Sequence, residues 1–229
     1  MPPSPEINEI EQHAQAKPLR ITVLSGSGPT QNAGFSPEND AARIEKIPFL
    51  TEHEWERLYS VIDSVRDRAI FQIAYHAGLR ASEVGLLEMR DYQPRTTVRG
   101  TDRLSIRRLK GSRSGDHYLA REEARALRSW MKKRGDHPGP IFTSRKGNPI
   151  SRQQLHVLMR KYGRRALLPA MLRHFHVLKH SCATTLLSRG MEIAQVKDWL
   201  GHANIQNTMI YAKVTNKRHE MVQQLADWR

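Results

Sequence analysis

The chain has 229 residues, 38% of them hydrophobic, and its 37 Lys and Arg residues against 23 Asp and Glu residues give a formal net charge of +14. A chain of this length buries a sizeable core in one domain, and it has no apolar run near the ~20 residues that cross a membrane, which argues against a membrane protein. The lone cysteine, Cys182, excludes an internal disulfide and a cysteine-built zinc site, so we expect a core residue in a cytoplasmic protein.

The positive charge is unevenly distributed along the chain. Residues 1–47 hold four basic and six acidic residues, a balance of −2, so residues 48–229 carry +16. Such a surplus on one folded unit favours a polyanionic partner, because the release of condensed counterions drives association with nucleic acid. Charge alone also fits a ribosomal or merely basic protein.

The first segment, residues 1–46, is rich in Pro, Gly, Ser and Asn and shows little periodicity, which predicts a flexible tail. Its first residues have neither the basic start nor the apolar core of a secretory signal. We expect the remainder, residues 47–229, to form one domain.

Three helices are predicted at the start of this domain. Thr51 and Glu54 form a capping-box pattern that begins the first helix. The second helix covers about 66–77 and stops at Gly78, and Ser82 is expected to cap a short third helix.

The centre of the chain changes from helical to strand patterning. Residues 95–120 are rich in β-branched residues and are punctuated by glycines, which predicts three short antiparallel strands. Further helices are expected at 121–134, after Ser151, and at 174–189, 192–200, 205–213 and 217–228. The predicted fold is therefore mainly α with a small antiparallel three-stranded sheet (α+β).

Common cofactor motifs are missing from the sequence. There is no GxxxxGK[ST] phosphate loop, and the histidines lack an HExxH arrangement or an accompanying carboxylate cluster. We expect no metal, no nucleotide and no other cofactor.

Two basic segments in the first half are candidates for a functional site. Arg80 lies at a helix junction with Glu83 in reach to orient it, and Lys110 lies at the tip of a basic hairpin. Taken singly, the first pattern is typical of a surface salt bridge and the second of a solvated turn.

Two segments in the second half add histidines and a tyrosine. His176 and Lys179 are spaced i,i+3 on one predicted helix face, followed by His180. His202 precedes Tyr211 by nine residues. Each alone is typical of a satisfied core histidine or a core aromatic residue.

The order of these segments resembles the tyrosine recombinase (phage-type integrase) family over about residues 48–215. The motifs GLRASE, a hairpin lysine, HVLKH, LGH and a tyrosine nine residues later follow one another as they do in that family. The chain is most similar to short members without a separate N-terminal core-binding domain, such as the fimbrial phase-switch recombinases, whose SRKGNPISRQQ-like segment it shares at 144–154. The resemblance implies a mainly helical catalytic domain with a small sheet, as the pattern predicts.

The resemblance also implies a role for each residue in DNA cleavage and rejoining. Arg80 would bind the non-bridging oxygens of the scissile phosphate, and Lys110 would protonate the departing 5′ oxygen. His176 and His202 would hydrogen-bond the phosphate, and Tyr211 would attack it to give a 3′-phosphotyrosine link. That link conserves the phosphodiester energy, so the reaction needs neither ATP nor a metal.

Lys179 departs from the family pattern, which has a second arginine at this position. Lysine keeps the charge but loses the bidentate fork. Either a sublineage has adapted to lysine, or this protein is an accessory or regulatory DNA-binding protein derived from a recombinase. A relaxing topoisomerase, which shares the tyrosine chemistry, is a third possibility.

The expected partner is double-stranded DNA. Six arginines, at 95, 99, 103, 107, 108 and 113, surround the predicted hairpins, and most of them are expected to contact phosphates or only water, with Arg113 as a DNA-binding candidate. Arg152 and Gln153 at a helix start are candidates for reading base edges. Recombination of the integration or inversion type needs four active sites at two duplexes, which implies a homotetramer on DNA. The last predicted helix, 217–228, either covers its own core or packs on a neighbouring protomer.

Overall fold

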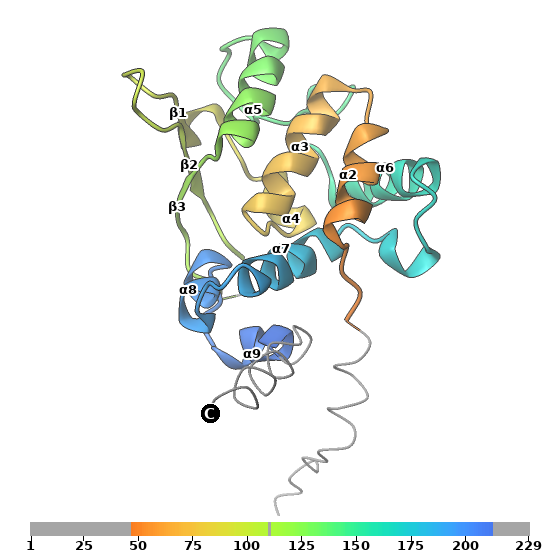
Figure 1. Cartoon of the computed structure of the whole chain (residues 1–229). Helices are drawn as coiled ribbons and strands as arrows, with labels where there is room; N and C mark the ends of the chain where they lie inside the picture. The colour runs from red at the N-terminus through yellow and green to blue at the C-terminus, as the bar shows by residue number, and fades with distance from the viewer. Residues whose placement is uncertain (1–46, 110, 213–229) are drawn as a thin grey trace, which may run out of the picture. The chain divides into compact units, whose positions relative to one another are not determined.

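The computed structural model describes residues 47–109 and 111–212 (Figure 1). The predicted tail at 1–46, the hairpin lysine Lys110 and the predicted last helix at 217–228 lie outside the described residues.

The described chain is mainly helical, and its elements follow one another in the predicted order. The helices are α2 (Glu52–Ser60), α3 (Val65–His76), α4 (Ala81–Val84), α5 (Arg121–Arg134), α6 (Arg152–Arg165), α7 (Val177–Ser188), α8 (Ile193–Trp199) and α9 (Gln206–Ala212). Two 3₁₀ turns, η1 (Met89–Asp91) and η2 (Ala170–Leu172), lie between them. The three strands are β1 (Tyr92–Gln93), β2 (Arg103–Ile106) and β3 (Gly115–Tyr118).

Local capping signals begin two of the helices as the sequence predicts. The Thr51 side chain accepts a hydrogen bond from the Glu54 backbone N–H, and the Glu54 carboxylate accepts one from the Thr51 backbone, which closes the capping box of α2. Ser151 caps α6 in the same way through Gln154. The prediction that Ser82 caps α4 is wrong, because α4 begins at Ala81 and the Glu83 carboxylate accepts from the Arg80 backbone N–H instead.

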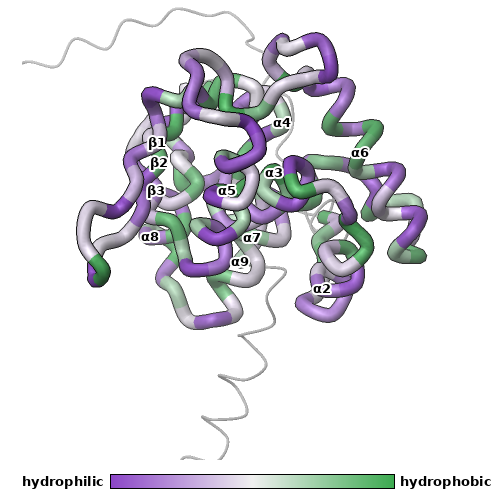
Figure 2. Tube along the Cα trace, turned by 90° about the horizontal axis from the view of Figure 1, so that it is seen from above, coloured by the Kyte–Doolittle hydropathy of each residue, from purple (hydrophilic) through white to green (hydrophobic). Residues whose placement is uncertain are grey.

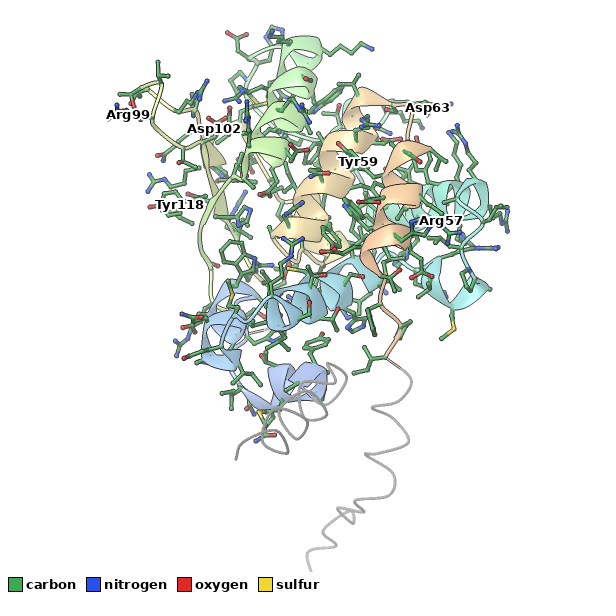
Figure 3. The ribbon with its side chains drawn as sticks, in the orientation of Figure 1. Arg57, Tyr59, Asp63, Arg99, Asp102 and Tyr118 are labelled. Atoms are coloured by element: carbon green, nitrogen blue, oxygen red, sulfur yellow. The ribbon has the colours of Figure 1, made fainter. Side chains whose placement is uncertain are left out.

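The sheet is antiparallel with strand order β1-β2-β3, as predicted. The first strand lies earlier than the predicted 95–120 region, because Pro94 follows Gln93 and has no N–H to continue the ladder. Figure 3 labels Asp102, which lies between the sheet and α5 and accepts hydrogen bonds from Tyr92 of β1 and Arg128 of α5. This buried carboxylate fixes the sheet against the helix.

The main core surrounds α3, which contacts α5 on one side and α7 on another (Figure 1). Its residues Ala69–Tyr75 are all buried, so this helix is covered all round. Helix α6 carries hydrophobic and hydrophilic residues in alternation (Figure 2) and buries Leu155 and Met159. It therefore covers the core with one face and exposes the other.

A second, smaller core joins α7, α8 and α9, which lie together at one end in Figure 1. Its buried residues include Cys182 of α7, Leu200 after α8 and Tyr211 of α9. Burial raises the pKa of the Cys182 thiol to about 12, so this cysteine is a core residue, as predicted. The predicted catalytic tyrosine thus belongs to a packed cluster.

The fold class is confirmed as mainly α with a small antiparallel sheet. In the part of the chain that the structure describes, no helix is long and apolar enough to cross a membrane.

Candidate active site

The junction between α3 and α4 presents Arg80 next to a buried carboxylate. The Arg80 Nη1 atom donates to Glu83 Oε1 at 2.8 Å and to Ser112 Oγ of the β2–β3 hairpin at 3.0 Å. The Arg80 side chain is partly exposed, whereas that of Glu83 is fully buried. Glu83 therefore holds the guanidinium from its buried side, as the sequence predicts.

Glu83 stays ionised although it is buried. Burial by itself would raise the pKa of Glu83, but the hydrogen bond from the Arg80 backbone and the charge of Arg108 outweigh it and hold the pKa below its usual range. Its two oxygens accept from Arg80, Arg108 and the Leu109 backbone. One carboxylate thus connects the start of α4 with the hairpin.

Arg108 differs from its predicted place among the surface arginines that surround the hairpins. Its side chain is 4% exposed, and it donates to Glu83 and to the carbonyls of Ala77, Gly78 and Trp199 at 2.8–3.2 Å. The prediction of a phosphate-contacting or solvated arginine is wrong for this residue. Its sequence neighbour Arg107 stays exposed and pairs with Asp91.

Lys179 lies on α7 and is 1% exposed. Its Nζ atom donates to the carbonyls of Gly78 and Leu200, both at 3.1 Å. Burial and the neighbouring charges of Arg108 and Arg80 lower the pKa of Lys179 to about 7. His176, which was predicted to share a helix face with it, is the N-cap residue of α7 and is exposed, so the two side chains differ in environment.

His176 and His180 lie edge to face with ring centroids 4.4 Å apart. Desolvation and the charges of Lys179 and Arg80 lower the pKa of His176. Burial and the charge of His176 lower the pKa of His180 to about 4. Both imidazoles are therefore neutral near pH 7 in the absence of a bound anion.

Tyr211 is 3% exposed and its hydroxyl lies 2.9 Å from His180 Nδ1. Burial raises the pKa of Tyr211, and the charge of Arg80 acts in the opposite direction. In the neutral tautomer that carries its proton on Nε2, His180 accepts the tyrosine proton through Nδ1, so in that tautomer the phenol faces a base.

His202 follows α8 and is buried, with Nδ1 2.9 Å from Thr208 Oγ1. Burial and the charges of Lys179, Arg80 and Arg108 lower the pKa of His202 to about 3. Lys179 donates to the Leu200 carbonyl two residues before His202, so His202 belongs to the same cluster.

The residues on both sides of Lys110 are fixed to this cluster. The Leu109 N–H donates to Glu83 Oε1 at 3.3 Å, and the Arg113 N–H donates to the Gly201 carbonyl at 2.7 Å. The hairpin therefore meets α4 and the end of α8 at the site.

The predicted DNA-contacting residues lie outside the cluster. Arg113, Arg152 and Gln153 are all exposed. Gln153 and Gln154 line a pocket between the start of α6 and residues Ser144–Lys146. Among the described residues, the structure brings together Arg80, Glu83, Arg108, His176, Lys179, His180, His202 and Tyr211. Sequence reasoning missed only Arg108, which the motif pattern does not distinguish from the arginines beside it.

Known proteins are similar to this chain in sequence. The tyrosine recombinase XerA of Pyrococcus horikoshii is 32% identical over 192 residues, which cover 80% of this chain and 65% of XerA. The type 1 fimbriae regulatory protein FimB of Escherichia coli is 33% identical over 175 residues, 73% of this chain and 84% of FimB.

Solved structures of recombinases are also similar to this chain. The crystal structure of XerA recombinase matches with a TM-score of 0.65 and 26% identity, covering 77% of this chain and 64% of that one. The XerH recombinase bound to palindromic difH substrate, at 23% identity, matches with a TM-score of 0.65 over 80% of this chain and 53% of XerH, which shows the fold alone.

The helical fold with its small sheet defines the class: a tyrosine recombinase catalytic domain. The phage integrase family model matches residues 48–218. The chain belongs to the phage integrase family.

Proposed function

We propose that this chain is a site-specific DNA recombinase that cleaves and rejoins DNA through a 3′-phosphotyrosine at Tyr211. The observation that carries the proposal is the Tyr211–His180 hydrogen bond of 2.9 Å beside a cluster whose cations outnumber its one carboxylate. The negative charge of a phosphodiester would balance the excess positive charge of this cluster.

Arg80 is the phosphate ligand in this proposal. Its Nη1 atom donates to Glu83, Ser112 and the Leu109 carbonyl, whereas Nε and Nη2 make no hydrogen bond to the described residues. Two parallel N–H groups of a guanidinium match two oxygens of a phosphate. His176, exposed at the start of α7, and His202 would donate to the same phosphate.

The chemical step balances with two proton transfers. The Tyr211 oxygen bonds to phosphorus while its proton passes to His180 Nδ1. The bond from phosphorus to the 5′ oxygen breaks, and that oxygen takes a proton from Lys110, the role that the family motif implies. Rejoining reverses both transfers, so no external energy source is required.

DNA binding extends beyond the cluster to α6. The Arg152 Nε atom lies 3.5 Å from His156 Nε2, one helical turn later. His156 in turn interacts electrostatically with His174 and His176. We place Arg152 and Gln153 in the DNA groove and Arg113 on the backbone. Exposed arginines at the β1–β2 connection, such as Arg99 in Figure 3, add nonspecific contacts.

Four copies of the chain on two duplexes complete the proposal, because strand exchange needs four cleavages. Sedimentation of the protein with duplexes that carry its cleavage site is expected to show a complex with four protein chains. A complex that never exceeds two chains would contradict this part of the proposal.

The test of the chemistry is a trapped covalent adduct. Duplexes that tile the DNA flanking the gene of this chain are nicked next to each test phosphate, so that the cleaved fragment diffuses away and the protein–DNA link accumulates. We expect a denaturation-resistant adduct on particular duplexes with the wild type and none with Tyr211→Phe. Tight binding without an adduct at any duplex would instead support the accessory DNA-binding protein, and relaxation of plasmids without a specific site would support a topoisomerase.

A further inference from the structure

The ends of α3 and α8 meet more closely than side chains would allow. Gly78, with φ +58°, follows α3, and a Cβ atom there would lie 2.4 Å from the Leu200 side chain. Gly201, with φ +69°, follows α8, and its Cβ would lie 2.5 Å from the Arg113 carbonyl and 3.1 Å from Arg108 Cγ. Two helix ends and the hairpin therefore share one junction that only glycines fit.

Two cations satisfy the carbonyl groups at this junction. Arg108 donates to Ala77 and Gly78 at the end of α3 and to Trp199 at the end of α8. Lys179 donates to Gly78 and to Leu200. The last carbonyls of a helix lack partners within the helix and carry its negative dipole end, so buried cations stabilise both ends together.

Two candidate phosphate ligands follow directly after these ends. Arg80 lies two residues after Gly78, and His202 lies two residues after Leu200. Arg108 also contacts Glu83, which orients Arg80. The junction therefore determines how far apart Arg80 and His202 lie.

We propose that Arg108 is a positioning residue of the strand-transfer site, which with Lys179 holds the ends of α3 and α8 together and so sets the spacing of Arg80 and His202. This inference rests on the proposed function. In this inference Lys179 binds protein carbonyls. Arg108 of the hairpin supplies a second guanidinium, which shares the Glu83 carboxylate with that of Arg80.

The position of Arg108 has a second consequence for the hairpin. Its side chain is anchored in the junction two residues before Lys110, and Leu109 between them donates to Glu83. The same contacts that join the helix ends thus fix the backbone that leads to the proposed general acid.

The activity test uses Arg108→Ala, Arg108→Lys and a matched control. Arg134→Ala is the control, because Arg134 also donates to three backbone carbonyls near a helix end, at Gly135, His137 and Pro140 after α5, far along the chain from the cluster. On the nicked duplex that traps the wild type, we expect Arg108→Ala to form adduct about 100-fold more slowly at saturating DNA, since small misplacements of reacting groups cost this much. The DNA dissociation constant should change by less than about threefold, since a buried side chain makes no phosphate contact.

Chemical rescue separates positioning from general damage. Millimolar guanidinium is expected to restore part of the adduct rate of Arg108→Ala and none of any loss in Arg134→Ala, because only the first leaves a guanidinium-shaped space at the junction that sets the spacing of Arg80 and His202. Arg108→Lys keeps the charge and is expected to remain slow, since the three N–H groups of one ammonium cannot replace the guanidinium at its four acceptors, Glu83 and the carbonyls of Ala77, Gly78 and Trp199. A wild-type rate in Arg108→Ala, or an equal loss in Arg134→Ala, would overturn the proposal.

A second readout needs no DNA and decides the inference even if no duplex traps the wild type. Amide hydrogen exchange in Arg108→Ala is expected to accelerate at 77–80 and 199–202 together, with α6 unchanged. In Arg134→Ala the acceleration should be confined to the end of α5. Unchanged exchange at either helix end in Arg108→Ala would show that Arg108 does not hold the junction.

Discussion

At the scale of single residues, the contact between the Tyr211 hydroxyl and His180 Nδ1 defines the first proton transfer of the proposed reaction. Burial raises the pKa of the phenol, which makes it a poor nucleophile unless a base takes its proton. Burial lowers the pKa of His180 to about 4, so near pH 7 this ring is neutral and able to accept.

Replacing His180 tests this transfer. We expect His180→Ala to slow adduct formation by about 10²–10⁴-fold, the usual contribution of a general base. His180→Asn places an amide oxygen near the Nδ1 position, so it should retain the tyrosine hydrogen bond and yet stay slow. His53→Ala on α2 serves as the control. A fast His180→Asn variant would assign the histidine to positioning instead of proton transfer.

Lys179 gives a pH-dependent contribution to stability. Its folded-state pKa of about 7 lies below the ordinary value of 10.5, so the unfolded chain binds one more proton between these pH values. The contribution of Lys179 to the free energy of unfolding therefore rises with pH from about 7 upward and is constant below. The charged groups that face it are Arg108, Arg80 and Glu83, beside the neutral thiol of Cys182, and of these the arginines disfavour the ammonium form.

The measurement compares urea unfolding of the wild type and Lys179→Met from pH 6 to pH 9.5. We expect the difference in unfolding free energy to grow above pH 7 in favour of the wild type, with a limiting slope of about 1.4 kcal/mol per pH unit. Parallel curves across this range would show that Lys179 titrates at its ordinary pKa.

At the scale of elements, the close approach of α8 to the hairpin depends on Gly201. Its positive φ alone disfavours alanine, and the Arg113 carbonyl lies where a Cβ would be. Gly147 has a similar φ of +80° but no atom within 4 Å of its Cβ position, so it carries the backbone penalty alone.

Alanine substitution at both glycines separates the two costs. We expect Gly147→Ala to destabilise the protein by about 1–2 kcal/mol, the penalty of a left-handed backbone. Gly201→Ala should cost at least about 1 kcal/mol more, the size of a typical overpacking penalty. Equal losses in chemical denaturation would indicate that the hairpin moves freely away from α8.

At the scale of the whole molecule, the charge of +16 on residues 48–229 is expected to favour binding of DNA, the proposed partner, because binding releases condensed counterions. The Arg113 side chain is exposed on the hairpin. Its backbone N–H donates to the Gly201 carbonyl, which holds the residue next to the site. Each phosphate contact contributes about −0.9 to the slope of log K against log salt concentration.

Removing one such contact should change that slope by a fixed amount. We expect Arg113→Gln to weaken duplex binding and to reduce the magnitude of the salt slope by about 0.9. Arg134→Gln, which removes an equal charge from the end of α5, should leave the slope unchanged. An unaltered slope in Arg113→Gln would remove this residue from the DNA interface.

The sequence by itself determined the features that depend on near neighbours. Thr51 and Ser151 begin helices because their capping partners are three residues away. Helix α5 spans 121–134 as predicted, since Gly135 with φ +82° ends it. The order of Arg80, His202 and Tyr211 was likewise visible from spacing, because each motif is local.

Only the tertiary structure decided which basic residues are buried. Arg107 and Arg108 are adjacent residues of one type, yet only Arg108 reaches a carbonyl 91 residues further along the chain. Lys179 donates to the carbonyls of Gly78, after α3, and Leu200, after α8. No sequence motif around Lys179 indicates these partners. Ser82 is not a cap because α4 already begins at Ala81, where Glu83, which the hairpin contacts, accepts the Arg80 backbone N–H. These outcomes depend on the burial of charge against distant partners, whose free energy is set only when the helix ends and the hairpin meet.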